Sequence, residues 1–185
     1  MRQALIIGGT GMLAPLVPWF VSQGYGVSVI GRSMDRLQQM IQKPILKSQY
    51  VTPIAVDYHD IPKLHRWIEH IQLMQGPLDI VVGWIHDPKG PVLEVICEEI
   101  HAYRYASWRF IDVVSASRRQ SLGQDVFDDS CKLQQVILGY KRTGVGARWL
   151  THDEIVSGVI RAIEHPEYQL IRVGDTSMPQ PREFL

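Results

Sequence analysis

The apolar residues of the chain fall into short runs rich in β-branched side chains, and these runs alternate with longer segments in which apolar residues recur at helical spacing. Near-continuous apolar runs of this length are typical of strands that are buried on both faces of a parallel sheet. Seven strands are therefore predicted, at residues 4–7, 27–30, 50–56, 78–85, 109–114, 133–140 and 170–173.

The segment after the first strand has the pattern of an amphipathic helix. Its apolar residues at 3.6-residue spacing are Leu13, Leu16, Val17, Phe20 and Val21. Gly24 follows them and is positioned to end the helix. Pro15 is compatible with a helix that starts beside it, whereas Pro18 predicts a kink or a later start, because proline cannot donate a backbone hydrogen bond.

Two later helices carry clear start signals. Asp60 is a predicted N-cap with Pro62 in the first turn, and Thr151 with Glu154 has the spacing of a capping box. The second of these helices is predicted to end at His165, which precedes a proline. The predicted buried stripes are Leu64, Trp67, Ile68 and Ile71 in the first helix, and Ile155, Val159, Ala162 and Ile163 in the second.

The alternation of strands and helices predicts a doubly wound parallel α/β sheet, the Rossmann fold, in a single domain that spans residues 1–185. The usual strand order is 3-2-1-4-5-6, which leaves the third strand at an edge. Pro53 lies in that strand and suits an edge, because proline cannot complete a ladder between two neighbours. The polar stretch 117–131 is predicted to be a loop.

Composition narrows the classes of function. Lys plus Arg total 19 and Asp plus Glu total 19, so the charge balance gives no reason to expect nucleic acid or an anionic membrane as a partner. No stretch approaches the roughly 20 apolar residues of a membrane span. Cys97 and Cys131 have no ligand-like spacing, and so few cysteines indicate a reducing compartment. A cytoplasmic protein is expected.

A glycine turn lies between the first strand and the first helix and has the form Gly-x-x-Gly-x-x-Ala, from Gly8 to Ala14. Gly8 permits the tight turn, Gly11 allows a pyrophosphate to approach the backbone, and Ala14 allows the helix to pack close to the sheet. Backbone N–H groups at the start of the helix then face the phosphates. The pattern predicts a dinucleotide site, with a tight turn that binds no ligand as the alternative.

The end of the second strand indicates which dinucleotide. Proteins that bind NAD commonly have a carboxylate there, which accepts a hydrogen bond from the ribose 2′-hydroxyl. This chain has Arg32 and Ser33 instead, which can pair with a 2′-phosphate through a charged fork and a hydroxyl donor. NADP(H) is therefore expected rather than NAD(H). A solvated surface arginine is the alternative, and Asp35 would weaken the positive field.

Over residues 3–116 these segments resemble the short-chain dehydrogenase/reductase (SDR) family, in an atypical and shortened form. The glycine turn is similar to the family's cofactor turn. Gly31-Arg32-Ser33, followed by Arg36-Leu37, resembles the corresponding stretch of NADP-preferring members, and Val56-Asp57 resembles the segment whose Asp contacts the adenine. Motif and resemblance together assign cofactor binding to Gly8, Gly9, Thr10, Gly11, Met12, Leu13, Arg32, Ser33, Asp57, Tyr58, Trp84 and Ile85.

The resemblance fails where the family carries out its chemistry. Ser115 falls where the family's catalytic serine lies, but no tyrosine has a lysine four residues later, and the helix that should carry that pair is not expected. Tyr105 and Arg109 have the spacing but precede the fifth strand. His86 follows the fourth strand and could polarise a carbonyl or pass a proton, with a histidine that only lines the cofactor pocket as the alternative. Catalytic candidates are thus His86 and Ser115, and Ser115 either hydrogen-bonds the substrate or only caps a turn.

Two functions remain open from the sequence. One is an NADP(H)-dependent reductase-like protein that acts on an unknown carbonyl or hydroxyl substrate, and the other is a cofactor-binding sensor or scaffold without hydride transfer. The missing Tyr-x-x-x-Lys favours the second, whereas the cofactor residues favour both. Resemblance implies a homodimer formed through the helical layer, with weak support from Trp108, Trp149 and Tyr168, which the sequence suggests are exposed.

Overall fold

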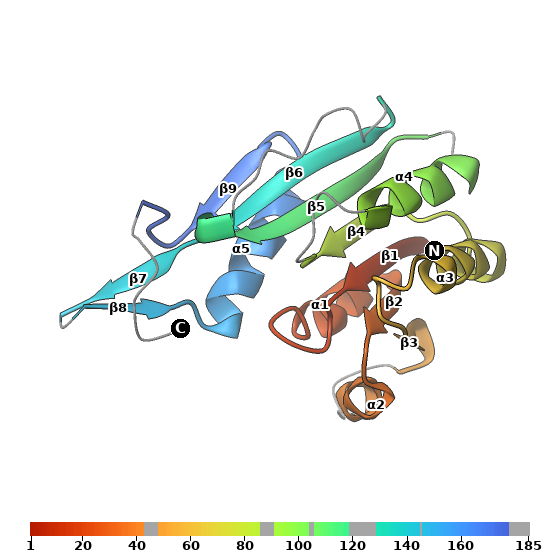
Figure 1. The fold of residues 1–185 in the computed structure, drawn as a ribbon, viewed down its shortest axis with the longest axis horizontal. Coiled ribbons are helices and arrows are strands. Elements are labelled where there is room, and N and C mark those ends of the chain that lie inside the picture. Colours follow the sequence, from red (N-terminus) through yellow and green to blue (C-terminus); the bar gives the residue numbers. More distant parts are fainter. Residues whose placement is uncertain (43–47, 86–90, 104–105, 119–128, 145, 178–185) are drawn as a thin grey trace.

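The computed structural model describes residues 1–42, 48–85, 91–103, 106–118, 129–144 and 146–177. Its core is a seven-stranded sheet of order β3-β2-β1-β4-β5-β6-β9, in which all neighbouring strands are parallel (Figure 1). The strands are β1 (Arg2–Ile7), β2 (Tyr25–Gly31), β3 (Val51–Ala55), β4 (Ile80–Gly83), β5 (Trp108–Ser115), β6 (Cys131–Leu138) and β9 (Leu170–Val173). The predicted order is confirmed, and Pro53 lies on the edge strand β3 as expected.

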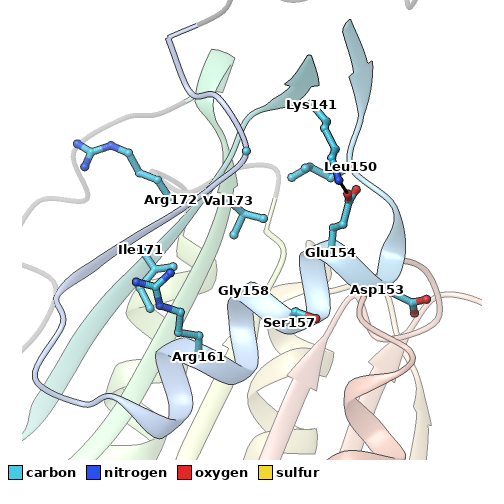
Figure 2. A pocket seen from close by; sticks show the side chains of 11 residues that line it. Lys141, Leu150, Asp153, Glu154, Ser157, Gly158, Arg161, Ile171, Arg172 and Val173 are labelled. Atoms are coloured by element: carbon cyan, nitrogen blue, oxygen red, sulfur yellow. Dashed lines mark hydrogen bonds and ion pairs between the residues drawn. The ribbon is translucent and has the colours of Figure 1, made fainter. Parts of the chain in front are cut away.

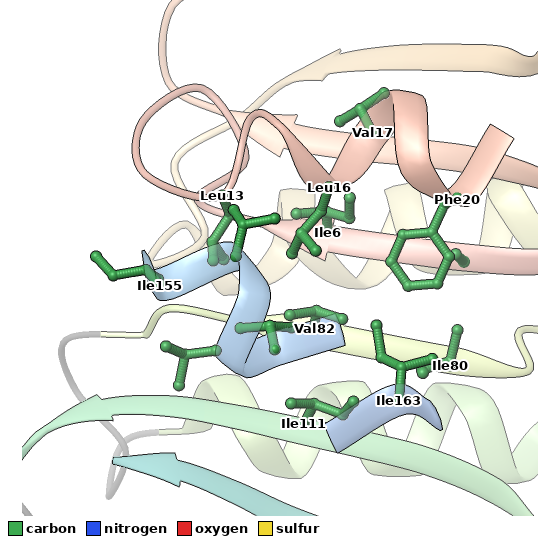
Figure 3. Close-up of a cluster of buried hydrophobic side chains, with 14 of the residues drawn as sticks. Ile6, Leu13, Leu16, Val17, Phe20, Ile80, Val82, Ile111, Ile155 and Ile163 are labelled. Atoms are coloured by element: carbon green, nitrogen blue, oxygen red, sulfur yellow. The ribbon is translucent and has the colours of Figure 1, made fainter. Parts of the chain in front are cut away.

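Helices cover both faces of this sheet. They are α1 (Leu16–Ser22), α2 (Met34–Ile41), α3 (Ile61–Gln75), α4 (Pro91–Tyr103) and α5 (His152–Glu164). Side chains of α1, α2 and α5 join one hydrophobic cluster, and those of α3 and α4 join a second cluster on the opposite face. In the first cluster, Leu16 and Phe20 of α1 and Ile163 of α5 meet over the strands (Figure 3). Two cores on one sheet define the doubly wound arrangement.

The two prolines near the start of α1 explain where this helix begins. The helix begins at Leu16, so Pro18 lies in the first turn, where a backbone N–H has no partner within the helix. The prediction of a later start is therefore confirmed. Residues 8–15 form successive turns, with the N–H of Ala14 donating to the carbonyl of Gly11. Gly24, at φ +78°, ends the segment in the left-handed conformation.

The predicted caps of α3 and α5 are also present, but one residue of the α3 stripe was predicted wrongly. Asp60 accepts a hydrogen bond from the N–H of Lys63, and the capping box of Thr151 with Glu154 is complete. Trp67 is 36% exposed rather than buried. It lies at the border of the stripe, because Gln72 occupies the buried position and donates to the carbonyl of Glu99 on α4.

The predicted strand 133–140 divides into two elements. β6 ends at Leu138, and β7 (Tyr140–Thr143) then pairs antiparallel with β8 (Gly146–Trp149) to form a hairpin that extends beyond the sheet (Figure 1). A side chain at Gly139 would collide with the backbone of Asp175, so a glycine at this position allows the chain to leave the sheet.

The predicted loop 117–131 is too long at both ends, because a short 3-10 helix spans Ala116–Arg118 and Cys131 already begins β6; residues 119–128 lie outside the described part. Trp108 is 1% exposed, because it begins β5 beneath the second core, so its predicted exposure is wrong. Tyr168 is exposed as expected, and Trp149 is half-buried. Of the helices in the described ranges, none combines the length and apolar character that a membrane span requires.

Candidate functional site

A cavity of about 300 Å³ lies beyond the carboxyl ends of the first strands. Its walls are Gly8, Thr10, Gly11, Ile30, Gly31, Arg32, Arg36, Asp57, Tyr58, His59 and Trp84. These residues follow or end β1, β2, β3 and β4, and the chain reverses its direction of travel across the sheet between β1 and β4. Ligands of open α/β sheets bind in the crevice at such a switch point.

The glycine turn forms one wall of this cavity and needs its small residues for different reasons. Gly8 has φ +82°, which side chains rarely adopt, and its N–H donates to the carbonyl of Ile30. A Cβ at Gly9 would lie 2.5 Å from Cγ1 of Val29, so this glycine allows the turn to pack against β2. Gly11 has nothing within 4 Å of the position of a Cβ and leaves the backbone accessible to a ligand.

The neighbouring wall comes from the end of β4. The N–H of Trp84 donates to the carbonyl of Ile7 at 3.1 Å, which holds the segment beside the glycine turn. A Cβ at Gly8 would lie 3.3 Å from the carbonyl oxygen of Trp84. The two backbones therefore approach closely, and the half-buried indole of Trp84 contributes to the lining.

The connection between β2 and α2 contributes two positively charged side chains to the cavity. Arg32 follows β2 directly, and Arg36 follows it by one helical turn; both are exposed and line the cavity. Ser33 caps α2, because its Oγ accepts from the N–H of Arg36 at 3.4 Å. The same cap that starts the helix thus brings the second arginine to the site. Asp35 lies in the first turn of α2 and is not among the lining residues.

The segment that follows β3 brings one carboxylate to the cavity, beside Arg32, and this carboxylate has a local partner. Oδ1 of Asp57 accepts from the backbone N–H of His59 and contacts Nδ1 of its ring, each at 3.0 Å. The backbone hydrogen bond from His59, then its ring and the guanidinium of Arg32, hold the pKa of Asp57 below its usual value. Asp57 is therefore ionised at neutral pH, and the ring of Tyr58 lies 4.3 Å from that of His59.

The structure brings together seven of the residues predicted to bind cofactor: Gly8, Thr10, Gly11, Arg32, Asp57, Tyr58 and Trp84. Five others do not line the cavity: Gly9, Met12, Leu13, Ser33 and Ile85. The side chains of Leu13 and Ile85 are buried in the two hydrophobic cores. Sequence reasoning did not assign Arg36 or His59 to the site. The spacing of Arg36, one helical turn from Arg32 and just inside a serine cap, is a signal that could have found it.

The catalytic candidates are less well assembled. Ser115 ends β5 and is half-buried, with its Oγ 3.2 Å from Oγ of Ser117, whereas His86 lies outside the described residues, as does Tyr105. Tyr140 is buried with its ring 5.1 Å from that of Trp149, and this burial raises the pKa of its hydroxyl. Lys141 instead extends to Glu154 at 2.8 Å.

Tyr140 and Lys141 therefore lie on opposite sides of their strand, as successive residues of a strand do, and form no acid–base pair. In the part of the chain that the structure describes, no three His, Cys, Asp or Glu side chains are placed to hold a metal ion. The seven histidines of the sequence have no metal-ligand spacing, so the sequence gives no reason to expect a metal site either.

No family model matches the chain, and no curated protein matches its sequence. Solved structures do match its fold. A doubly substituted SDR of Serratia marcescens has a TM-score of 0.72 at 17% identity, covering 96% of this chain and 98% of the other. A variant of actinorhodin polyketide ketoreductase with NADPH has a TM-score of 0.73 at 13% identity, covering 94% of this chain and 95% of the other. A short-chain dehydrogenase of Burkholderia cenocepacia in complex with NADP has a TM-score of 0.70 at 13% identity, covering 96% of this chain and 98% of the other.

At these identities the likeness concerns the fold. The chain has the Rossmann fold of SDR structures, in a single α/β domain, so the resemblance seen in the sequence is confirmed at that level.

Proposed function

We propose that the chain binds NADP(H) in the cavity at the ends of β1 to β4. The observation that carries this proposal is the pair Arg32 and Arg36, which line the cavity directly after β2, where proteins that bind NAD commonly have a carboxylate. Two guanidinium groups match the geometry and charge of a 2′-phosphate. Two of the structures with the same fold have NADPH or NADP bound.

The remaining walls fit the rest of the nucleotide. The open backbone at Gly11 suits the pyrophosphate, because no side chain blocks its approach. Asp57 and Tyr58 border the end of the cavity next to the arginines, which suits the adenosine half. Trp84 lies on the β4 side, toward the strands that would receive the nicotinamide.

We further propose that the protein is an oxidoreductase of SDR type, acting on a carbonyl or hydroxyl substrate. When bound, the nicotinamide would supply or accept a hydride. In that setting the hydroxyl of Ser115, at the end of β5, would hydrogen-bond the substrate oxygen, and His86 would supply the proton, because an imidazole pKa lies near neutral.

A second function is a cofactor-binding sensor or scaffold without hydride transfer. The observation that favours it is the absence from the whole sequence of a tyrosine followed by a lysine four residues later. That pair supplies the proton in the family that the chain resembles. We also propose a cytoplasmic location, which the scarcity of cysteine supports.

The two functions are separated by a screen of carbonyl compounds with NADPH, preceded by a thermal-shift series with NADPH, NADP⁺, NADH and NAD⁺. Thermal stabilisation by NADPH and NADP⁺ together with turnover of a carbonyl compound supports the oxidoreductase. Stabilisation without turnover of any carbonyl compound supports the sensor or scaffold instead. If no nucleotide stabilises the protein, both proposed functions are contradicted.

The residue assignment has its own test. Ser115→Ala and His86→Ala are each expected to lower turnover while leaving the thermal shift with NADPH unchanged. Lys132→Ala is the matched control, because Lys132 is an exposed residue of β6 outside the cavity. Turnover that survives both substitutions would contradict the roles of Ser115 and His86 but not the proposal that the protein is an oxidoreductase. Turnover abolished by Tyr140→Phe alone would identify a tyrosine as the proton donor.

A further inference from the structure

A second and larger hollow lies on the far edge of the sheet, between α5 and β9 (Figure 2). Its volume is about 510 Å³, and its lining residues are Lys141, Leu150, Asp153, Glu154, Ser157, Gly158, Arg161, Ile171, Arg172, Val173 and Gly174. The floor is apolar, formed by Leu150, Ile171 and Val173. A side chain at Gly158 would collide with Val173, so this glycine allows α5 to lie directly on the strand.

The hollow follows an edge of the sheet at which no other described strand pairs with β9. β9 is the last strand in the order, and four successive residues, 171–174, line the hollow. Since neighbouring side chains of a strand point to opposite faces, a surface that touches all four includes the edge of the backbone.

The hydrogen bonds to β6 identify which backbone groups remain at that edge. The carbonyls of Gln169 and Val173 accept from Gln135 and Gly139 of the β6 side, each at 2.9 Å. By the two-residue repeat of a parallel ladder, the N–H and C=O groups of Leu170 and Arg172 point away from β6. They form a template onto which another strand can pair.

The charges beside this edge are mainly positive. Arg161 extends from α5 toward Ile171, and Arg172 projects from β9 (Figure 2). Both are exposed, and neither side chain forms an ion pair with another described residue. An anionic ligand would therefore find, at this end of the hollow, two cations with which no described carboxylate forms an ion pair.

The acidic residues of the hollow do not cancel this charge. Glu154 accepts hydrogen bonds from Arg148 and Lys141, each at 2.8 Å, and from the N–H of Thr151. Asp153 lies at the opposite end, in the first turn of α5 (Figure 2).

We propose that this hollow is a docking site for an extended acidic segment of a partner protein, which adds to β9 as an eighth strand. Apolar side chains of the segment would enter the hollow against Leu150 and Gly158, and its acidic side chains would point to the opposite face, beside Arg172. A second copy of this chain fits less well. Self-pairing of β9 about a two-fold axis, in the register that places Arg172 opposite its own copy, would bring like charges together. The proposal is independent of the nucleotide site.

The test uses the full chain and a fluorescent peptide of alternating glutamate and valine, followed by anisotropy. A peptide of alternating lysine and valine is the matched control, with the same strand propensity and the opposite charge. Saturable binding is expected for the acidic peptide and not for the basic one. Binding of neither peptide, or equal binding of both, overturns the proposal.

Variants at one position separate charge from strand pairing. Arg172→Gln should weaken binding about threefold, because it removes one exposed charge pair and keeps the strand. Arg172→Pro should weaken it about tenfold or more, because it also removes the outward N–H, at an edge where proline is tolerated. Lys132→Gln, on the exposed side of β6 and outside the hollow, should leave binding unchanged.

A measurement on the wild type covers the case in which the proline variant does not fold. Hydrogen exchange at the Arg172 amide should slow on addition of the acidic peptide, while Ile171 and Val173, already paired with β6, change little. Unchanged exchange at Arg172 during saturable binding would overturn strand addition. A loss of mass in solution caused by Arg172→Pro, without peptide binding to the wild type, would instead identify an interface between copies.

Discussion

Gly9 and Val29 are so close that a Cβ on the glycine would lie 2.5 Å from Cγ1 of the valine. The glycine turn therefore rests on β2 without space for a methyl group. Gly9→Ala should lower the free energy of unfolding by about 1–3 kcal/mol, the usual cost of overpacking. Denaturant unfolding measures this change.

Gly11→Ala is the matched control for that substitution. Nothing lies within 4 Å of its Cβ position, so stability should be nearly unchanged. Nucleotide affinity should fall, because the methyl group occupies the approach to the backbone. If Gly9→Ala were as stable as the wild type, or Gly11→Ala bound nucleotide normally, the assignment of the two glycines would be wrong.

Asp112 on β5 gives a prediction about pH. The side chain is buried, with Oδ2 accepting from Nε2 of Gln135 at 3.1 Å, and burial raises the pKa of the carboxyl to about 6. Because this pKa lies above the unfolded value of about 3.9, the folded state holds the proton more tightly. Stability should then fall as pH rises from about 4 to about 6 and stay lower above that range.

Asp112→Asn should remove this dependence and keep the contact with Gln135. The variant is expected to be more stable than the wild type at pH 7, by up to about 3 kcal/mol, and to match it near pH 4. Thermal or denaturant unfolding across that range measures the difference, with the exposed Asp129→Asn as control. A variant less stable than the wild type at pH 7 would show that the carboxylate has a compensating partner.

Glu154 attaches the hairpin to α5. Its carboxylate accepts from Arg148 and Lys141 of the hairpin, and these hydrogen bonds, that of Arg148 first, hold its pKa well below the usual value. Glu154→Gln keeps the capping geometry and removes both ion pairs, so hydrogen exchange of the β7–β8 amides should accelerate. Glu164→Gln, at the exposed end of α5, should not change it. Equal exchange in both variants would mean that strand pairing alone holds the hairpin.

A homodimer is expected at micromolar concentration. Trp108 gives no support, because it is buried, but Leu73 and Met74 at the end of α3 are 63% and 70% exposed and enlarge the apolar surface of the helical layer. Light scattering should give about twice the 21.1 kDa of one chain. A mass of one chain throughout the micromolar range would contradict the expectation.

Local chemistry in the sequence predicted most of the fold. Continuous apolar runs and caps such as Asp60 identified the strands and helix starts, because burial on both faces and unsatisfied N–H groups leave direct marks on the sequence. The break at Gly139 was missed, since only the close approach of Asp175, distant in sequence, reveals it. The burial of Trp67 was predicted wrongly for the same reason, because contacts of α3 with α4, such as that of Gln72 with the carbonyl of Glu99, decide which side of α3 is buried.

Some residues of the candidate site were likewise predictable from local sequence, whereas others join it only through the fold. Gly8, Gly11 and Arg32 were predictable, because a phosphate turn and the residue after β2 are local features. His59 joins the cavity only through its contacts with Asp57, which a sequence pattern does not encode. The substrate is not defined by any motif, because such pockets are built from loops that vary independently of the fold.

Arg32 and Arg36 are proposed to select the 2′-phosphate, and titration calorimetry with NADPH and NADH tests this selection most directly. The wild type should bind NADPH more tightly than NADH. Arg32→Ala should weaken the binding of NADPH by about 1.5–3 kcal/mol, the value of a hydrogen bond to a charged group, and leave the affinity for NADH nearly unchanged. Tighter binding of NADH by the wild type, or an equal loss for both nucleotides in Arg32→Ala, would contradict the claim.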